Sequence, residues 1–431
     1  MPARWFCVFS LFLRFRPVAW LLLWAAATGW PATIQAQEVQ PPLPFRFESP
    51  RQKRARLPFE FQRNLIIVQA SLNGKGPFNF LLDTGVSISL ITDPTLVVPL
   101  KLRRGEMYRV AGVGEEGALE AFMSDSVRVE MPGIVAPALS FLVLSADVLN
   151  LSGYVGMPVH GILGYDVFRS FAVEIEPDAT SLLLHTPLSY RPPKGRRWTS
   201  VPLEIEARKP YIRVPVGLSD SLLLPLKLVL DTGAGHALSI ETGSDPRLSL
   251  PPNRLRAQLG QGLSGTINGY IGRVQNMQLG RYQLNSLLTS FPDADNGAQR
   301  AEVPRNGNVG LELLKRFDMV VDYTHNKLWL KPNSLFQDPF EHDMCGMELL
   351  ATGRDYRRYI VLKVQPNSPA STAGLTPGDE LMSINLLPVS SFSLTEISRI
   401  FHSEDGKVLF LLFQRPDGEL YPTRIKLKRQ I

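Results

Sequence analysis

Short apolar runs, each broken by an Asp-Thr-Gly triplet, mark two places in the chain. The sequence FLLDTGVSISL occupies residues 80–90, and LVLDTGAGHAL occupies residues 228–238. In each copy an apolar run leads directly into the Asp, which is typical of a buried β-strand that ends in a tight turn. One such triplet is weak evidence, because Asp and Gly are ordinary turn residues. A second copy behind a matching apolar run points to a common origin.

Other landmarks repeat together with the triplets. Asp83 and Asp231 are 148 residues apart (231 − 83). Further landmarks recur in the same order and at nearly the same offset: glycine-rich turns (Gly112 and Gly114, then Gly260 and Gly262), alternating strands at 127–133 and 274–280, glycines 164 and 310, and strand pairs at 171–187 and 317–332. An ordered set of this kind indicates a duplicated lobe.

The pattern within each copy predicts an all-β lobe. The expected strands are short, alternate apolar with polar residues, and are separated by Gly, Pro, Asn or Asp. One short helix is expected in each copy, GYDVFRS at 164–170 and LELLKRF at 311–317. We therefore expect two pseudo-symmetric β-barrel lobes, at 57–190 and 191–335, each with its Asp at the end of a strand.

The first residues are typical of an export signal. Three arginines precede the apolar run VAWLLLWAAA at 18–27, and small and polar residues around Ala36 then provide a cleavage position. The run is shorter than the roughly 20 apolar residues that a membrane-spanning helix needs. We expect residues 1–36 to be a cleaved signal peptide and 37–56 a leader, which places the protein in the periplasm or outside the cell. An uncleaved membrane anchor is the alternative.

Charge and cysteine content exclude several kinds of site. The formal net charge of +6 falls to +3 without the three signal arginines (6 − 3), and the basic clusters at 51–56 and 194–198 are expected to be solvated linkers, so we expect no nucleic-acid partner. Cys345 is the one cysteine beyond the signal, so neither an intramolecular disulfide nor a cysteine-based zinc site can form. The histidines show no metal-ligand spacing, and we expect no metal and no cofactor.

Two carboxyl groups at strand ends have a specific chemical use if the lobes pack about a two-fold axis. Asp83 and Asp231 would then meet, and because two adjacent carboxyls cannot both ionise, they would share a proton. Such a pair can deprotonate a water as it attacks a peptide carbonyl and return a proton to the leaving amine. The glycine-rich hairpins would cover the cleft as flaps.

These features resemble the retropepsin-type aspartic proteases, here with both lobes in one chain as in the bilobal pepsin-like enzymes. The resemblance covers roughly residues 57–335. It implies that Asp83 and Asp231 are the catalytic acids and that the turn supporting them consists of Thr84, Gly85, Thr232 and Gly233. The family's apolar-apolar-Gly element matches fully at 162–164, but only in part at 308–310, where Asn308 replaces an apolar residue.

Residues just after the triplets carry further expectations. Val86 and Ala234 follow the two glycines and offer no hydroxyl to the neighbouring carboxylate. His236 could be a residue of the substrate cleft, or an ordinary histidine of an exposed loop. We favour the exposed loop, because a lone histidine without a partner set usually has no specific role.

The pattern changes after a Pro-containing linker at 332–343. Ser-Pro-Ala, Ala-Gly-Leu and Gly-Asp follow in this order within 359–385, and a helix with a capping box of Ser393 and Glu396 comes next. This order resembles a bacterial-type PDZ domain, an α+β module expected over 344–431. Such domains bind an extended peptide as an added strand, often through a loop that grips its carboxylate. The expected loop, GRDYRRYIV at 353–361, is not a small-residue loop, so docking onto the protease is the alternative role.

We therefore expect an exported, single-chain aspartic endopeptidase that acts on polypeptides, with a PDZ module that binds a peptide or tethers the substrate. Both acids lie in one chain, so we expect a monomer. One alternative is an inactive retropepsin-like shell that binds peptides, which Asn308 mildly favours and the two intact triplets disfavour. A strand-rich scaffold without enzymatic role is the other, and it leaves two exposed acids unexplained.

Overall fold

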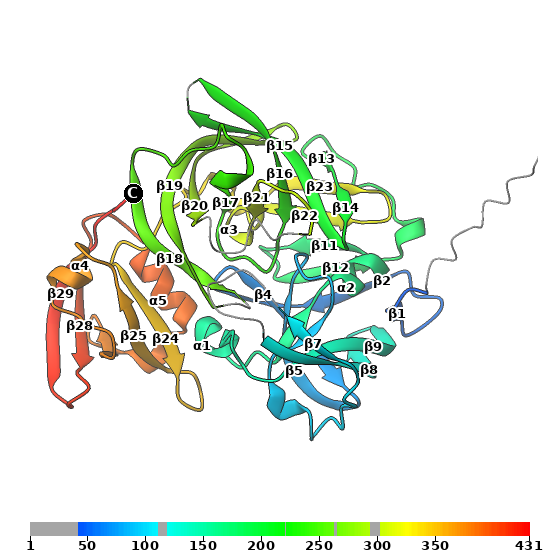
Figure 1. Ribbon diagram of the computed structural model, residues 1–431, viewed down its shortest axis with the longest axis horizontal. Coiled ribbons are helices and arrows are strands. Elements are labelled where there is room, and N and C mark those ends of the chain that lie inside the picture. The colour runs from blue at the N-terminus through cyan, green and yellow to red at the C-terminus, as the bar shows by residue number, and fades with distance from the viewer. Residues whose placement is uncertain (1–41, 111–118, 220, 263–264, 294–301) are drawn as a thin grey trace, which may run out of the picture. The chain divides into compact units, whose positions relative to one another are not determined.

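The computed structural model describes residues 42–110, 119–219, 221–262, 265–293 and 302–431. Strands dominate and form four sheets, one in each repeat, one shared by the repeats and one in the C-terminal module (Figure 1). The all-β prediction for the lobes is thereby confirmed. The expected signal peptide at 1–36 lies outside the described residues, as does the start of the leader. Among the residues that are described, no helix is both long and apolar enough to cross a membrane.

The sheet of the first repeat places Asp83 at its centre. In spatial order it contains β1 (Arg46–Phe47), β9 (Ile134–Leu144), β6 (Leu90–Ile91), β10 (Gly161–Leu163), β5 (Lys75–Leu82), β4 (Leu65–Leu72), β8 (Leu119–Met131) and β7 (Met107–Val110), with β3 (Glu60–Gln62) beside β4. β5 ends directly before Asp83 and pairs in parallel with β10, which carries the apolar-apolar-Gly element. A strand buried on both sides needs an apolar run, which explains the residues before the triplet.

The sheet of the second repeat follows the same plan. In spatial order it contains β14 (Glu204–Glu206), β15 (Lys209–Ser219), β16 (Leu222–Leu230), β21 (Gly307–Val309), β17 (Leu238–Ile240), β20 (Tyr282–Pro292), β19 (Gly265–Leu279) and β18 (Arg254–Gly262). β16 ends directly before Asp231 and pairs in parallel with β21. The parallel pair at the triplet thus recurs in both repeats, as expected of a duplicated lobe.

A third sheet joins the repeats. Its strands are β13 (Thr199–Pro202), β23 (Lys327–Pro332), β22 (Phe317–Asp322), β11 (Ala172–Glu176), β12 (Ser181–His185) and β2 (Arg54–Pro58). β11 of the first repeat pairs antiparallel with β22 of the second, with Ile175 opposite Met319. The closing strand pairs that the sequence predicts in each copy therefore meet in one continuous sheet.

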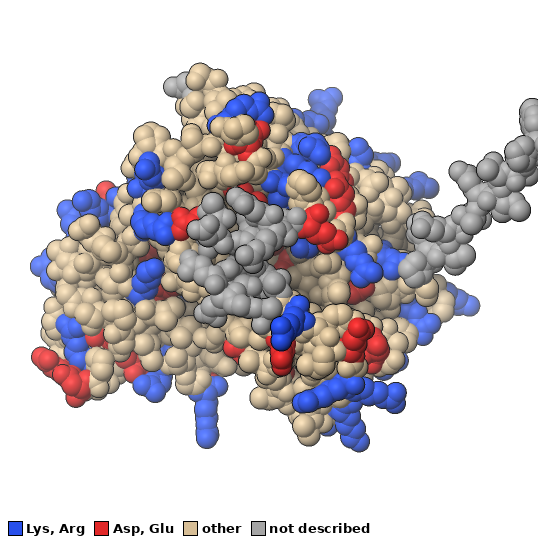
Figure 2. All heavy atoms as spheres, in the orientation of Figure 1, with Lys and Arg blue, Asp and Glu red and all other residues tan. Residues whose placement is uncertain are grey.

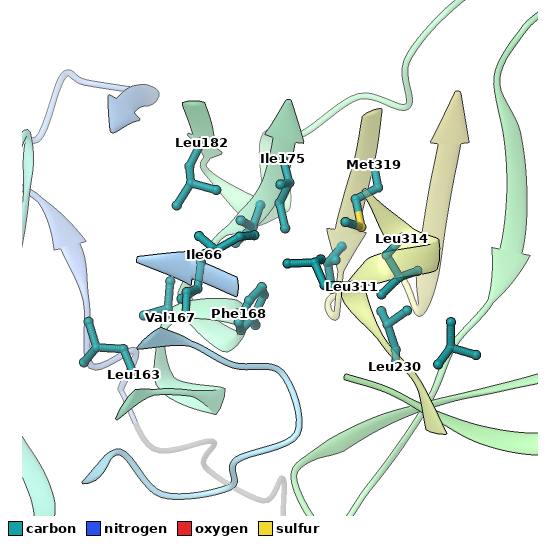
Figure 3. Close-up of a cluster of buried hydrophobic side chains, with 14 of the residues drawn as sticks. Ile66, Leu163, Val167, Phe168, Ile175, Leu182, Leu230, Leu311, Leu314 and Met319 are labelled. Atoms are coloured by element: carbon teal, nitrogen blue, oxygen red, sulfur yellow. The ribbon is translucent and has the colours of Figure 1, made fainter. Parts of the chain in front are cut away.

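Of the helices in the repeats, α2 (Tyr165–Ser170) and α3 (Leu311–Leu314) pack on this shared sheet, whereas α1 (Leu151–Val155) packs against the C-terminal module. Short 3-10 turns span Pro94–Leu96, Pro187–Ser189, Thr242–Ser244 and Ser334–Gln337. Figure 3 shows Val167 and Phe168 of α2, and Leu311 and Leu314 of α3, among the apolar side chains of the sheet. One buried apolar cluster runs through both repeats and reaches as far as Phe340. The core therefore holds the two repeats, and with them the two triplets, in place.

The C-terminal module has a sheet and a core of its own. Its strands are β24 (Met347–Thr352), β25 (Arg358–Val364), β26 (Glu380–Ile384), β28 (Val408–Gln414) and β29 (Leu420–Lys426), with β27 (Leu387–Pro388) on β26. The module also contains the 3-10 turn Val389–Ser391 and the helices α4 (Pro369–Thr372) and α5 (Leu394–Phe401), and the predicted capping box of Ser393 and Glu396 starts α5. Cys345 is buried in this core, as a structural thiol would be.

The expected carboxylate-gripping loop before β25 is the turn of a hairpin, since residues 353–357 connect β24 and β25. Its binding of a carboxylate stays a prediction. β24 lies at the edge of the sheet. β24 comes directly after the linker and before the segment at 359–385 that carries the PDZ-like motifs. The sheet of the module therefore begins before that segment.

The module contacts the first repeat through the turn between β3 and β4. Thr395 of α5 accepts a hydrogen bond from the Arg63 amide (3.1 Å) and donates one to Gln62 (2.6 Å). The Arg63 guanidinium lies over the Tyr154 ring at 4.5 Å and reaches the Leu349 carbonyl on β24 at 3.5 Å. The edge strand of the module is therefore in contact with the lobe itself.

Charges of both signs are interspersed over the face drawn in Figure 2. Several pairs there and elsewhere are surface ion pairs, such as Arg213 with Glu204 at 2.8 Å. Exposed pairs of this kind contribute little to stability. The buried charge of Arg316 is a different case.

We predict that Arg316 anchors the linker to the second repeat. Its side chain is 1% exposed, lies 3.7 Å from the centre of the Phe340 ring, and donates to the Pro339 carbonyl (3.2 Å) and the Glu312 carboxylate (3.1 Å). Arg316→Met would remove the buried donor from these acceptors and should lower the free energy of unfolding by about 3 kcal/mol in chemical denaturation. Arg213→Met, in the exposed pair, is the matched control and should change stability little. Equal losses in the two variants would contradict the assignment.

Candidate active site

The two Asp-Thr-Gly turns lie against each other at the interface of the repeats. The amide of Thr84 donates to the Thr232 hydroxyl, and the amide of Thr232 donates to the Thr84 hydroxyl, both at 3.0 Å. Each hydroxyl in turn donates across the interface, Thr84 to the Leu230 carbonyl (2.5 Å) and Thr232 to the Leu82 carbonyl (2.9 Å). Both threonines are fully buried. The bonds form a closed reciprocal set.

The two carboxyl groups lie above the glycines of the turns. Within each turn the Gly amide donates to its own Asp, Gly85 to Asp83 at 2.6 Å and Gly233 to Asp231 at 3.1 Å. A β-carbon on Gly85 would lie 3.1 Å from an oxygen of both carboxyls, and one on Gly233 would lie 2.2 Å from the Asp83 carboxyl. The glycines are therefore required because the carboxyl of the opposite repeat occupies the place of a side chain.

The electrostatics of the pair are asymmetric. The pKa of Asp83 lies well above its ordinary value, first because burial disfavours the charged form and second because the negative charge of Asp231 adds to the effect. A hydrogen bond with Asp231 acts in the same direction, whereas the positive charge of Lys209 opposes it. Burial and the neighbouring charge thus both favour the protonated form of Asp83.

The second carboxyl has a neighbour that the sequence did not lead us to expect. Asn308 on β21 donates through Nδ2 to Oδ2 of Asp231 at 2.8 Å, and its Oδ1 lies 3.2 Å from Nε2 of His236. The residues after the triplets, Val86 and Ala234, offer no hydroxyl, but a donor reaches Asp231 from another strand. The polar Asn in an otherwise apolar element was the available signal.

His236 is not an exposed loop residue, so that interpretation is wrong. The side chain is half-buried and bonded to Asn308. Burial lowers its pKa, while the charge of Asp231 and the bond to Asn308 act in the opposite direction. The imidazole therefore belongs to the surroundings of the carboxyl pair.

Paired strands lie at both positions where flap hairpins were predicted. β7 and β8 pair with Met107 opposite Phe122, and β18 and β19 pair with Arg254 opposite Gly272. Gly260 lies at an irregularity in the second hairpin, with φ at +157°, where the lack of a side chain permits the bend. The predicted turn glycines of the first hairpin, Gly112 and Gly114, lie outside the described residues.

Within the described part of the chain, no group of three or more His, Cys, Asp and Glu side chains could hold a metal ion. The polar groups described at the site are the two carboxyls with the glycine amides that donate to them, and the Asn308–His236 pair beside Asp231.

Comparison with known families agrees with this geometry. Residues 68–167 match the family described as aspartyl protease, and residues 360–415 match the PDZ domain family. No curated protein matches the chain. The chain thus carries an aspartyl protease domain and a C-terminal PDZ domain. The first match includes Asp83 but ends before Asp231, so the pairing of the two acids rests on the contacts described above.

We predict that the threonine hydroxyls hold the interface together. Thr84→Val would remove one donor and leave the buried Leu230 carbonyl and Thr232 amide unpaired, so the free energy of unfolding should fall by about 2–4 kcal/mol. Thr84→Ser keeps the hydroxyl and should lose far less. The double variant with Thr232→Val should lose less than the sum of the singles, because the four bonds form one unit. Strict additivity in chemical denaturation would argue against a reciprocal set.

Proposed function

We propose that the chain is an aspartic endopeptidase, which hydrolyses peptide bonds through one water activated by Asp83 and Asp231. The observation that carries the proposal is the meeting of the two carboxyls over the reciprocal threonine bonds. An Asp at a strand end has no need of a second Asp in front of it for structural reasons. Placing the two together costs free energy through charge repulsion and desolvation, which is typical of a functional site.

The proposed reaction uses the asymmetry of the pair. Asp231, as carboxylate, takes a proton from the water while the water oxygen attacks the peptide carbonyl carbon. Asp83 donates its proton to the carbonyl oxygen, so the tetrahedral intermediate is neutral. Collapse of the intermediate breaks the C–N bond, the nitrogen receives the proton held by Asp231, and Asp83 regains its proton from the intermediate's hydroxyl. No proton is gained or lost in the cycle.

Asn308 no longer favours an inactive shell. As a polar residue in the apolar-apolar-Gly element, Asn308 mildly favoured an inactive peptide-binding protein. Its amide, however, donates to the Asp231 carboxylate. A donor of this kind stabilises the charged form that the reaction needs. The proposed polypeptide substrate would lie extended beneath the flap hairpins, as the resemblance to retropepsins implies.

The proposal includes export, for which the basic and apolar N-terminal pattern at 1–36 is the support. It also includes recruitment of polypeptides by the PDZ domain, whose edge strand β24 could accept an added strand. The contact between Arg63 and the Leu349 carbonyl favours a second role, in which the domain braces the first lobe. The two roles differ in what removal of the domain does.

Our prediction for the acids is a loss of turnover in either single variant. Asp83→Asn and Asp231→Asn should each reduce kcat by at least about 10⁴-fold, and the double variant should be no worse, because the two carboxyls act on one water. Cleavage of an unstructured protein such as casein, followed by mass spectrometry, provides the measurement. Glu204→Gln, in the exposed ion pair with Arg213, is a control that should keep normal turnover. Near-normal activity in either Asp variant would refute the proposal.

Removal of the PDZ domain should separate recruitment from bracing. A chain that ends at Glu341 keeps Phe340 and the partners of Arg316, and the two domains have separate cores, so the truncated form should fold. Under recruitment, kcat and KM for a short peptide stay near the full-length values, while KM for a long protein substrate rises several-fold. Loss of short-peptide cleavage by a folded truncated chain would instead assign the bracing role.

A further inference from the structure

Asn308 donates a hydrogen bond to Asp231, and the equivalent position of the first repeat offers no such donor to Asp83. In the first repeat the matching element has Ile162, whose side chain cannot donate. Both residues lie in a short strand parallel to the strand that ends at the Asp, Ile162 opposite Leu81 and Asn308 opposite Val229. The repeats thus agree in backbone and differ in chemistry at this position.

The direction of the Asn308 amide follows from its neighbours. Its nitrogen lies 2.8 Å from Oδ2 of Asp231. A reversed amide would set an oxygen against a carboxylate oxygen, and neither atom of that pair has a hydrogen to donate while Asp231 is ionised. The amide oxygen then faces Nε2 of His236 at 3.2 Å, which must carry a hydrogen to donate. One chain of donors therefore runs from His236 through Asn308 to Asp231.

We propose that Asn308 and His236 are positioning residues that make Asp231 the ionised member of the pair and leave the shared proton on Asp83. The inference rests on the proposed protease function and concerns the regulation of charge within that same site. Asn308 acts through the Asp231 carboxylate and His236 acts through Asn308, and neither residue gains or loses a proton in the proposed reaction. His236 fixes the direction of the Asn308 amide, and Asn308 fixes the charge.

The other charged groups around the pair are compatible with this assignment. Asp231 faces Asp83 across the interface and His236 in its own repeat, and Asp83 also experiences Lys209 at the start of β15 and Tyr323 after β22. Lys209 favours ionisation of Asp83, but burial and the charge of Asp231 outweigh it. Burial also lowers the pKa of the His236 imidazole and so favours its neutral form, which can donate without adding a charge.

Asn308 should affect the pH dependence of the rate in one direction. Activity requires the pair with one proton, so the acid limb of the rate profile reports formation of that state and the alkaline limb its loss. The Asn308 amide stabilises the ionised Asp231 and so lowers the pKa of the acid limb. Removing the amide raises that pKa, and the acid limb moves to higher pH. Asp231 is ionised on both sides of the alkaline limb, so that limb should move less.

The experiment compares full-length variants on one fluorogenic peptide across pH. Asn308→Leu removes the donor and should move the acid limb of kcat upward by about one pH unit, with kcat about tenfold lower and KM nearly unchanged. His236→Leu should shift the limb in the same direction by less, and His236→Gln, which keeps a donor, should restore it. Asn285→Leu, on the exposed side of β20, is the matched control and should leave the profile unchanged.

Two outcomes would overturn the inference. One is a lower kcat in Asn308→Leu with the acid limb unmoved, which would reduce Asn308 to a packing role. The other comes from ¹⁵N NMR of the wild-type imidazole, where a hydrogen on Nδ1 and a bare Nε2 of His236 would break the donor chain. The NMR result holds even if Asn308→Leu fails to fold.

Failure of the underlying protease function looks different. A wild-type chain that cleaves nothing, or an Asp83→Asn variant that remains active, refutes the protease proposal. A bell-shaped wild-type profile with an unmoved acid limb in Asn308→Leu refutes only the present inference.

Discussion

Contact between the two triplets depends on the exchange of hydrogen bonds between Thr84 and Thr232. Each threonine supplies one donor to a carbonyl of the opposite strand and one acceptor to the opposite amide. These backbone groups belong to residues that are buried at an interface of strand ends, and unpaired they would each cost free energy. The exchange satisfies them and fixes the distance between the repeats. The carboxyls lie beside that contact, and the Asn308 amide reaches one of them.

The shared sheet and the apolar core give this contact its rigidity. β11 and β22 continue one sheet from repeat to repeat, and buried side chains from α2 and α3 pack on it. Because protein interiors are close-packed, a shift of one repeat would disturb many contacts at once. Two acids that repel each other can therefore be held together, since the opposing free energy is spread over the whole interface.

The sequence was sufficient for the parts of this architecture that depend on local pattern and repetition. The strands before Asp83 and Asp231, the two short helices and the capping box of Ser393 follow from periodicity and turn chemistry. The pairing of the triplets followed from duplication, because equal elements at equal offsets imply a two-fold arrangement.

What the sequence could not supply are contacts that depend on side-chain direction or on distant segments. An Asn in place of an apolar residue signals a difference, but only its rotamer shows that the amide points at Asp231. His236 had no visible partner because Asn308 is 72 residues away. In the same way, the role of Arg316 under Phe340 and the contact of Arg63 with β24 join segments that no local pattern connects.

Fusion of the two repeats into one polypeptide has a consequence for evolution at the carboxyl pair. A homodimer with perfect symmetry must present every residue twice, so an Asn beside one acid would also stand beside the other and would favour ionisation of both. The doubly charged pair has no proton to give. A single gene with two unequal halves escapes that constraint, because a substitution can enter one half alone. Ile162 and Asn308 are such unequal counterparts, and symmetry breaking at this one position lets each acid specialise.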